Sequence, residues 1–275
     1  MADQSEPGAL AAPSPSASAP PLSETPTDLA PRFTVIAPMK NEAENVARLA
    51  AEIGEACAPL GPFEAIFVDD GSDDATADII DAARADHPWL RRVSHARSCG
   101  QSAAVRTGVL HARAPIVATL DGDGQNPPAE LPKLVTPLLS PEGAHIGLVA
   151  GQRVGRQDTF SKRVASKLAN GLRAWILRDA TRDTGCGLKG FRRDAFLALP
   201  FFDHLHRYLP ALFKREGWEI AHVDVTHRAR EHGASNYSNI GRALVGATDL
   251  IGVWWLLRRR KLPVIASTSD APTKT

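Results

Sequence analysis

The feature that most constrains the fold is an alternation of short apolar runs and amphipathic segments over the first part of the chain. Apolar and β-branched residues fill runs of strand length at 32–38, 63–68, 90–94 and 116–120. Between these runs, apolar residues recur at helical spacing. This order predicts an α/β fold with a mostly parallel, Rossmann-like sheet, flanked by helices that form right-handed crossovers.

The first helix is expected to follow Asn41. This side chain can cap a helix, and Glu44 stands at the position of its partner in a capping box. Val46, Leu49 and Ile53 then recur at the spacing of a buried helix face.

Three of the predicted strands end in polar segments, at Pro38–Glu42, Asp69–Ser72 and Asp121–Gln125. Ligands of parallel sheets bind beyond the carboxyl ends of the strands, so we expect all three segments to open into one crevice. The sequence lacks a Gly-x-Gly-x-x-Gly fingerprint after the first strand, and it lacks a P-loop. A nucleotide held by carboxylates and a metal ion therefore fits better than one held by a glycine loop.

Asp121 and Asp123 are the strongest candidates for metal ligands. Prolines follow them and stop the strand, so both carboxylates can converge where the chain curls. Carboxylate oxygens suit Mg²⁺ or Mn²⁺ carrying a diphosphate. The alternative is an acidic turn that closes a buried strand. For Asp69 and Asp70, the alternative to ligand binding is a turn or helix cap.

Length and composition bound the architecture and the partners. The 275 residues suffice for one domain, expected over 32–239, with an amphipathic C-terminal helix over 240–262. Residues 1–31, rich in Ala, Pro and Ser, and residues 263–275 are expected to be disordered tails. The 32 Lys and Arg against 31 Asp and Glu create no global field that favours nucleic acid.

The three cysteines, Cys57, Cys99 and Cys186, have no paired spacing. They are interpreted as reduced thiols of a cytosolic protein, with Cys186 buried by packing. The histidines show no convincing zinc-site spacing.

Two basic segments leave a membrane role open. Arg163, Lys167 and Arg173 flank an apolar stripe in a predicted helix, and form either a solvated face or a surface for anionic lipid. Near the C-terminus, Trp254 and Trp255 precede Arg258–Lys261. This pattern fits a helix at a membrane interface, or a terminal helix packed on the core with its basic end complementing the helix dipole.

Taken together, these motifs resemble family 2 glycosyltransferases, and within them the polyprenyl-phosphate sugar synthases of the dolichyl-phosphate mannosyltransferase type. The match runs from about Phe33 to Tyr237. The matching segments are Ala37–Glu42, Val68–Ser72, Asp121–Asp123, Gly151–Arg153, Asp183–Lys189 and Arg230–Tyr237.

The resemblance implies a single-domain GT-A fold and metal-dependent, inverting transfer of a hexose. The donor would be a GDP- or UDP-linked sugar, and the acceptor a polyprenyl phosphate at the cytoplasmic face of the membrane. Peripheral membrane contact is implied, and a membrane-protein partner could replace the spanning helices of some relatives. The alternatives are transfer to a hydroxyl of a saccharide or lipid core, and a non-catalytic nucleotide-binding scaffold.

The resemblance also assigns residues. Asp121, Asp123 and Gln125 would hold Mg²⁺ or Mn²⁺, and Arg153 and Arg230 would neutralise the diphosphate. Asp183 is the candidate general base for a hydroxyl acceptor, or else a helix-to-loop cap. The implied substrate contacts are Pro38, Lys40, Glu42, Val68, Asp69, Asp70, Leu120, Asp121, Gly122, Gln125, Arg153, Arg230 and Asn236. Asn236 replaces a lysine of the mannosyltransferase pattern, so either Arg228 or Arg230 acts alone or the donor differs.

Overall fold

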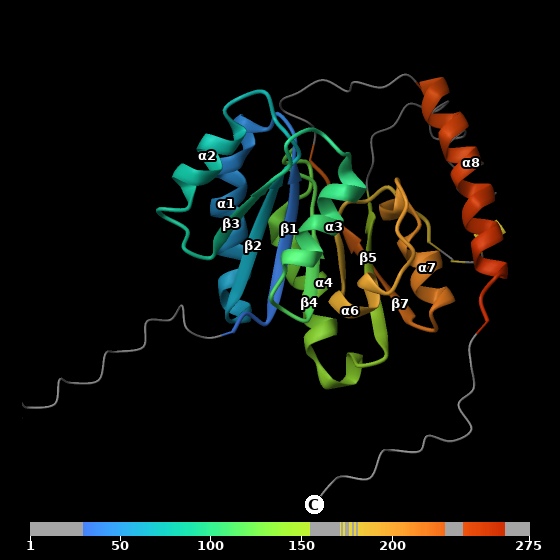
Figure 1. Ribbon diagram of the computed structural model, residues 1–275. Coiled ribbons are helices and arrows are strands. Elements are labelled where there is room, and N and C mark those ends of the chain that lie inside the picture. The colour runs from blue at the N-terminus through green and yellow to red at the C-terminus, as the bar shows by residue number, and fades with distance from the viewer. Residues whose placement is uncertain are drawn as a thin grey trace, which may run out of the picture.

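The computed structural model describes residues 30–154, 171, 173, 176–177, 179, 181–228 and 239–261, the backbone alone at 239–245. In this part of the chain, a seven-stranded sheet with the order β3-β2-β1-β4-β6-β5-β7 lies between two layers of helices (Figure 1). The predicted α/β architecture is confirmed.

The elements have these bounds. The strands are β1 Phe33–Met39, β2 Phe63–Asp69, β3 Leu90–Ser94, β4 Ile116–Thr119, β5 Ile146–Arg153, β6 Lys189–Arg192 and β7 Glu219–Val225. The α-helices are α1 Ala43–Cys57, α2 Thr76–Ala83, α3 Gln101–His111, α4 Leu131–Leu139, α6 Arg193–Leu197, α7 Leu209–Arg215 and α8 Asn239–Arg258. Short 3₁₀ turns are η2 Ala58–Leu60, η3 Pro128–Glu130, η4 Pro141–Gly143 and η5 Leu205–Arg207.

Strand β6 departs from the parallel pattern. β1 pairs in parallel with β2 and β4, whereas β6 runs antiparallel to both β4 and β5. The start of β6 therefore lies beside the carboxyl ends of β4 and β5. The loop at 181–188 is thereby brought to the ligand-binding edge.

Alternating side chains of the strands build a core on each face of the sheet. In β1, Phe33, Val35 and Ala37 are buried against one face, while Ile36 is buried against the other. The first face also buries apolar residues of α1 and α4, and the second buries those of α3, α6 and α7. The predicted helical stripe Val46, Leu49, Ala50 and Ile53 is fully or almost fully buried.

The start of α1 differs from the prediction. Asn41 has a left-handed backbone with φ of 55°, and the residue before the helix is Glu42, which makes no side-chain cap. The predicted capping box is wrong. Instead, the side chain of Asp74 accepts a hydrogen bond from the N–H of Ala43 at 3.3 Å, and Asn41 Oδ1 accepts one from the N–H of Asp73. The loop after β2 therefore fastens the start of α1.

The basic helix predicted near 160–177 falls largely outside the described residues, including Arg163 and Lys167. Arg173 is described, and it faces neither solvent nor lipid. Its guanidinium donates to both carboxylate oxygens of the buried Asp179, at 2.8 and 3.0 Å. The prediction of a solvated or lipid-facing role is therefore wrong for Arg173.

Helix α8 packs on the core, which is one of the two alternatives weighed for it; contact with a membrane stays a prediction. Val253 is buried, and Leu250, Leu256 and Leu257 pack against the core on the α7 side of the sheet. On the outer side, Ile251, Trp254 and Trp255 are exposed. Among the described helices, none has the length and apolar character needed to cross a membrane.

Candidate active site

A cavity of about 670 Å³ opens at the carboxyl ends of β1, β4 and β5. Its volume is in the range that binds a small molecule or cofactor. It is lined by Pro38, Met39, Lys40, Glu42, Asp70, Gln101, Ala104, Val105, Thr119, Leu120, Asp121, Gly122, Asp123, Arg153, Asp183, Thr184, Gly185, Cys186, Gly187, Lys189, His206, Arg207 and Leu209. The crevice predicted from the polar strand ends is present.

Asp121 lines this cavity, two residues beyond the end of β4. Gln101 donates to its Oδ1 at 2.7 Å, and Asn126 donates to its Oδ2 at 2.8 Å. Gly187 lies so close that a Cβ there would overlap the Asp121 carboxylate. The loop before β6 is thus packed directly on the predicted metal ligand.

The electrostatics around Asp121 are unfavourable for its own charge. Burial raises the pKa of Asp121, and the nearby charge of Asp123 raises it further. Lys189 and Arg153 act in the opposite direction but do not reverse the shift. Two neighbouring carboxylates that destabilise each other in this way form a site that a cation would stabilise.

The donor set around Asp121 fits a hard divalent cation. It consists of oxygens, as Mg²⁺ and Mn²⁺ prefer. The side-chain oxygen of Asn126 is buried and has no hydrogen-bond partner among the described residues, although the same side chain contacts Asp121. Gln125 follows in the same turn but is not part of the cavity lining; its backbone N–H donates to Asp123 Oδ1.

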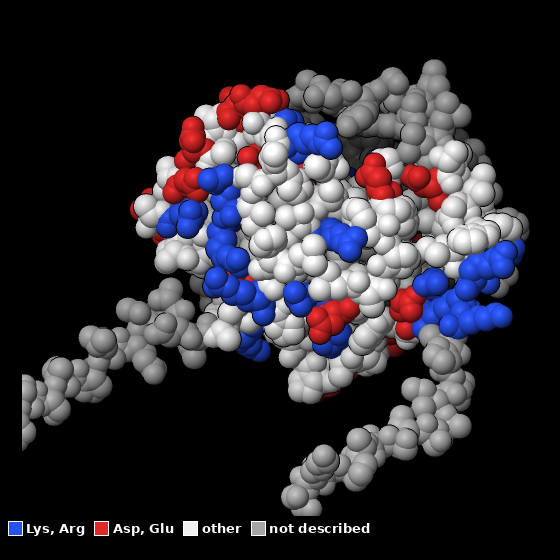
Figure 2. All heavy atoms as spheres, viewed as in Figure 1, with Lys and Arg blue, Asp and Glu red and all other residues white. Residues whose placement is uncertain are grey.

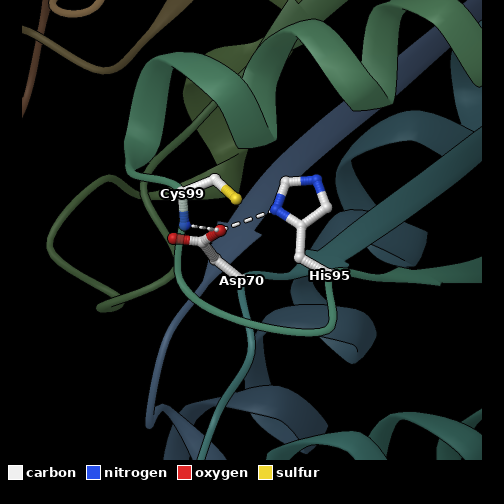
Figure 3. A group of neighbouring side chains, drawn as sticks. All are labelled: Asp70, His95 and Cys99. Atoms are coloured by element: carbon white, nitrogen blue, oxygen red, sulfur yellow. Dashed lines mark hydrogen bonds and ion pairs between the residues drawn. The ribbon is translucent and has the colours of Figure 1, made fainter.

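The carboxylate of Asp70, directly after β2, has a different set of hydrogen-bond partners from that of Asp121 (Figure 3). Its Oδ1 contacts His95 Nδ1 at 2.6 Å and accepts from the N–H of Cys99, and its Oδ2 accepts from the Ser98 hydroxyl and the N–H of Gly100. Burial alone would raise the pKa of Asp70, but these hydrogen bonds outweigh burial and lower it.

These contacts make Asp70 an anchor for the segment between β3 and α3. Ligand atoms of Asp70, His95 and Cys99 lie within 4.8 Å of one another, a spacing compatible with a metal ion. However, both carboxylate oxygens already have two partners each, which fills the usual capacity of the group. A metal at this cluster would have to displace them.

Arg153 and Asp183, predicted separately as a diphosphate contact and a base, form an ion pair. Arg153 Nε and a terminal guanidinium nitrogen donate to the two oxygens of Asp183, at 2.6 and 2.9 Å. Each side chain is only 15% exposed. The hydrogen bonds that Arg153 donates to Asp183 raise the pKa of Arg153 despite its burial, so the guanidinium stays charged.

Lys189, the first residue of β6, lines the cavity. It is 3% exposed, and its ammonium donates to the carbonyls of Thr184 and Cys186. Burial lowers its pKa, while the charges of Cys186, Asp121 and Asp183 act in the opposite direction. Cys186 itself is fully buried, as predicted, and burial raises the pKa of its thiol.

With this geometry established, comparison with known proteins identifies the family. Residues 34–199 match glycosyl transferase family 2. The chain belongs to this family. The dodecaprenyl-phosphate galacturonate synthase of Rhizobium johnstonii is 33% identical over 238 residues, which cover 84% of this chain and 69% of the relative.

A second relative of this family 2 glycosyltransferase is the undecaprenyl-phosphate 4-deoxy-4-formamido-L-arabinose transferase of Edwardsiella ictaluri. It is 34% identical over 209 residues, which cover 74% of this chain and 62% of the relative. The chain thus spans about two thirds of the length of these two proteins.

Solved structures share the fold of this family 2 glycosyltransferase. Glucosyl-3-phosphoglycerate synthase from Mycobacterium tuberculosis, in complex with Mn²⁺, uridine diphosphate and glucosyl-3-phosphoglycerate, has a TM-score of 0.61 at 21% identity, covering 86% of this chain and 85% of that one. A mannosyltransferase from Pyrobaculum calidifontis, in complex with GDP-Man and Mn²⁺, has a TM-score of 0.62 at 21% identity, covering 88% and 68%. The fold is of the GT-A type.

The structure of the glycosyltransferase gathers most of the predicted site residues. Eleven of the thirteen predicted substrate contacts are described, and eight of them line the cavity: Pro38, Lys40, Glu42, Asp70, Leu120, Asp121, Gly122 and Arg153. Val68 is fully buried in the core, and Asp69 is buried and accepts from the N–H of Ser72, so neither lines it. Arg230 and Asn236 lie outside the described residues.

Four residues at or beside the cavity were not predicted from the sequence. Gln101 at the start of α3 and His206 and Arg207 in η5 line the cavity, and Asn126 donates to Asp121 Oδ2 without lining it. Gln101 and Asn126 flank predicted elements, and their position beside strand ends was the available signal. No local sequence signal marks His206 and Arg207, because they are distant in sequence from the strand ends and reach the cavity through tertiary packing.

Proposed function

We propose that this family 2 glycosyltransferase transfers a hexose from a nucleoside-diphosphate sugar to a polyprenyl phosphate, with Mg²⁺ or Mn²⁺ bound at Asp121 and Asp123. The observation that carries the proposal is the pair of carboxylates in the cavity, where Asp121 has a raised pKa and, among the described residues, only amide donors. The names of the two curated relatives support the acceptor class.

The donor would bind along the carboxyl ends of β1 and β4, with its diphosphate beside Asp121 and Asp123. When bound, the metal ion would neutralise charge that develops on the leaving diphosphate. Mn²⁺ accompanies a nucleotide in both solved structures named above. The guanidinium of Arg153 faces the same cavity and adds positive charge there.

The acceptor would attack the anomeric carbon directly, with inversion. One phosphate oxygen forms the new bond to that carbon as the bond to the diphosphate oxygen breaks, and the nucleoside diphosphate leaves. Because a phosphate acceptor is already an anion at neutral pH, the step needs no strong general base. The ion pair of Asp183 with Arg153 fits this mechanism, since a carboxylate held by two guanidinium hydrogen bonds is a weak base.

The test is incubation of the protein with Mn²⁺ or Mg²⁺, a panel of UDP- and GDP-sugars, and short polyprenyl phosphates, with products identified by mass spectrometry. We expect a glycosyl phosphate lipid that disappears when the metal is chelated. Transfer that survives chelation would contradict the metal site, and transfer only to saccharide hydroxyls would contradict the acceptor class.

Asp183→Asn separates a phosphate acceptor from a hydroxyl acceptor. With a phosphate acceptor, we expect kcat to fall less than about tenfold, because only the support of Arg153 is lost. Loss of a general base would instead cost about a hundredfold or more. The pH profile of kcat distinguishes the two, since removal of a base would also abolish its acidic limb.

We also propose that the outer face of α8 contacts an anionic membrane surface, at the cytoplasmic face where the acceptor would be met. Ile251 and Trp255 are exposed there, and Arg258 stacks on the Trp254 ring at 4.1 Å. Figure 2 shows basic side chains gathered where this helix ends, at Arg258–Lys261. Aromatic rings beside cations are suited to the interfacial layer of an anionic bilayer.

Co-sedimentation with phosphatidylglycerol vesicles tests this surface. Arg258→Gln combined with Arg259→Gln should weaken binding at least about tenfold, because each basic residue near the surface contributes about 1 kcal/mol. The matched control is Arg84→Gln combined with Arg113→Gln, at side chains 51% and 67% exposed that lie away from α8. Equal losses in both variants would contradict a specific role of α8.

A further inference from the structure

The segment around η5 connects the cavity with α8. On the cavity side, His206 Nδ1 and the hydroxyl of Ser102 lie 2.7 Å apart. On the outer side, His204 Nδ1 contacts Asp249 of α8 at 2.9 Å, and the Tyr208 hydroxyl donates to the carbonyl of Gly246 at 3.3 Å. This segment is therefore held from both sides, and Arg207 lies within it.

Arg207 differs from the other cations that line the cavity. Lys40 donates to Gly71 and Asp73, Arg153 is paired with Asp183, and the Lys189 ammonium is taken up by backbone carbonyls. Arg207 is partly buried, and its guanidinium has no hydrogen-bond or ion-pair partner among the described residues. A partly desolvated cation facing a cavity is stabilised when an anion binds there.

His206, next to Arg207, is suited to act as a neutral donor. Its backbone N–H points at the Ser102 oxygen, at 3.5 Å, so the Ser102 hydroxyl is free to donate to His206 Nδ1. This arrangement leaves the proton of the imidazole on Nε2. Burial, with the charges of Lys189 and Arg207, lowers the pKa of His206 to about 3, so the ring is uncharged at neutral pH.

We propose that Arg207, assisted by the Nε2–H of His206, binds the phosphate of the acceptor. The inference rests on the proposed transfer to a polyprenyl phosphate and assigns the acceptor end of the cavity. A guanidinium can donate two parallel hydrogen bonds to a phosphate, which fixes its orientation as well as its position. Because His204 and Tyr208, on either side of η5, contact α8, a lipid whose chain lies at the outer face of α8 would bring its phosphate to Arg207.

The assignment is tested by measuring the binding of three probes. Each measurement is made with saturating Mn²⁺ and the nucleoside diphosphate of the active donor. Farnesyl phosphate carries both lipid and phosphate, farnesol carries the lipid alone, and inorganic phosphate carries the anion alone. Arg207→Gln should weaken farnesyl phosphate binding roughly ten- to a hundredfold, the range for a hydrogen bond to a charged group. Farnesol binding should not change, and inorganic phosphate should compete with farnesyl phosphate in the wild type alone.

Arg106→Gln is the matched control. It removes the same charge from α3, where Arg106 stacks on Phe201 at 4.5 Å and does not line the cavity. In steady-state assays, Arg207→Gln should raise the KM for the acceptor and leave the KM for the donor unchanged. Arg207→Lys should restore part of the acceptor affinity, because it keeps the charge and loses the paired geometry.

Three results would overturn the assignment. These are an unchanged acceptor KM in Arg207→Gln, an equal loss of farnesol binding, and a rise in the donor KM, which would place Arg207 at the diphosphate instead. The proposed function fails separately. A wild-type protein that binds inorganic phosphate through Arg207 but transfers no sugar to polyprenyl phosphates would retain the anion site and lose the acceptor class.

Discussion

Two acidic strand ends in this molecule look alike in sequence, but their carboxylates differ in hydrogen-bond partners and in the direction of their pKa shifts. After β2, the Asp70 carboxylate has four polar partners, and its pKa is lowered. After β4, the Asp121 carboxylate has two amide donors, and burial and Asp123 raise its pKa. The first arrangement stabilises the folded chain, whereas the second leaves charge uncompensated at the point where a ligand would bind.

The largest effect is expected from Asp121→Asn. If Asp121 holds a metal ion under the diphosphate, the rate of sugar transfer should fall about a hundred- to a thousandfold. The unfolding free energy without metal should stay within about 1 kcal/mol of the wild type or rise, because a buried, repelled charge is removed. Asp194→Asn, at an aspartate side chain 92% exposed on α6, is the control. A fall in unfolding free energy large enough to account for the lost activity would contradict the contrast with Asp70.

Asp70→Ala, unlike Asp121→Asn, should lower the unfolding free energy. It leaves the N–H groups of Cys99 and Gly100, the Ser98 hydroxyl and the His95 ring without their shared acceptor. We expect the unfolding free energy to fall by about 2–4 kcal/mol, measured by urea denaturation. Asp73→Ala, at a side chain 84% exposed in the same loop, should cost much less. Equal costs at the two positions would show that Asp70 is not an anchor.

The smallest effect concerns pH. The folded-state pKa of Asp70 lies below its ordinary value, so its charge contributes stability above the unfolded pKa of about 3.9, and this contribution is lost as pH falls through the folded pKa. The difference in unfolding free energy between wild type and Asp70→Asn should therefore be full at pH 7 and shrink below about pH 4. A difference that stays constant down to pH 3 would contradict the lowered pKa.

Much of the fold could be predicted because its signals are local. The runs that became β1 to β4 carry apolar, β-branched residues and end in turn residues, so both the strands and the shared crevice followed from the sequence. Helix α4 was missed because Pro132 and Pro137 look like helix breakers; Pro132 lies in the first turn, where proline is tolerated, and Pro137 lies inside the helix. The direction of β6 has no local signal in a strand of four residues.

The candidate site was less predictable, because its hydrogen bonds and ion pairs join residues that are distant in sequence. Arg153 and Asp183 were singled out for different roles, and their pairing across 30 positions became visible only in the structure. The Asp70 anchor likewise depends on donors 25 to 30 positions away. Arg207 has no distinctive motif around it in the sequence, and only its place between the cavity and α8 makes it a candidate for binding the acceptor.

The antiparallel course of β6 has a consequence for how this enzyme can diversify. In parallel sheets, ligand-binding loops follow strands, so changing a loop alters the path into the next helix and crossover. Here the loop at 181–188 precedes its strand and contributes Asp183 to the cavity and Gly187 to the packing on Asp121. Provided that the glycine at 187 and the Asp183 partner of Arg153 are kept, the rest of this loop can change between related enzymes without altering the registers of β1, β2 and β4.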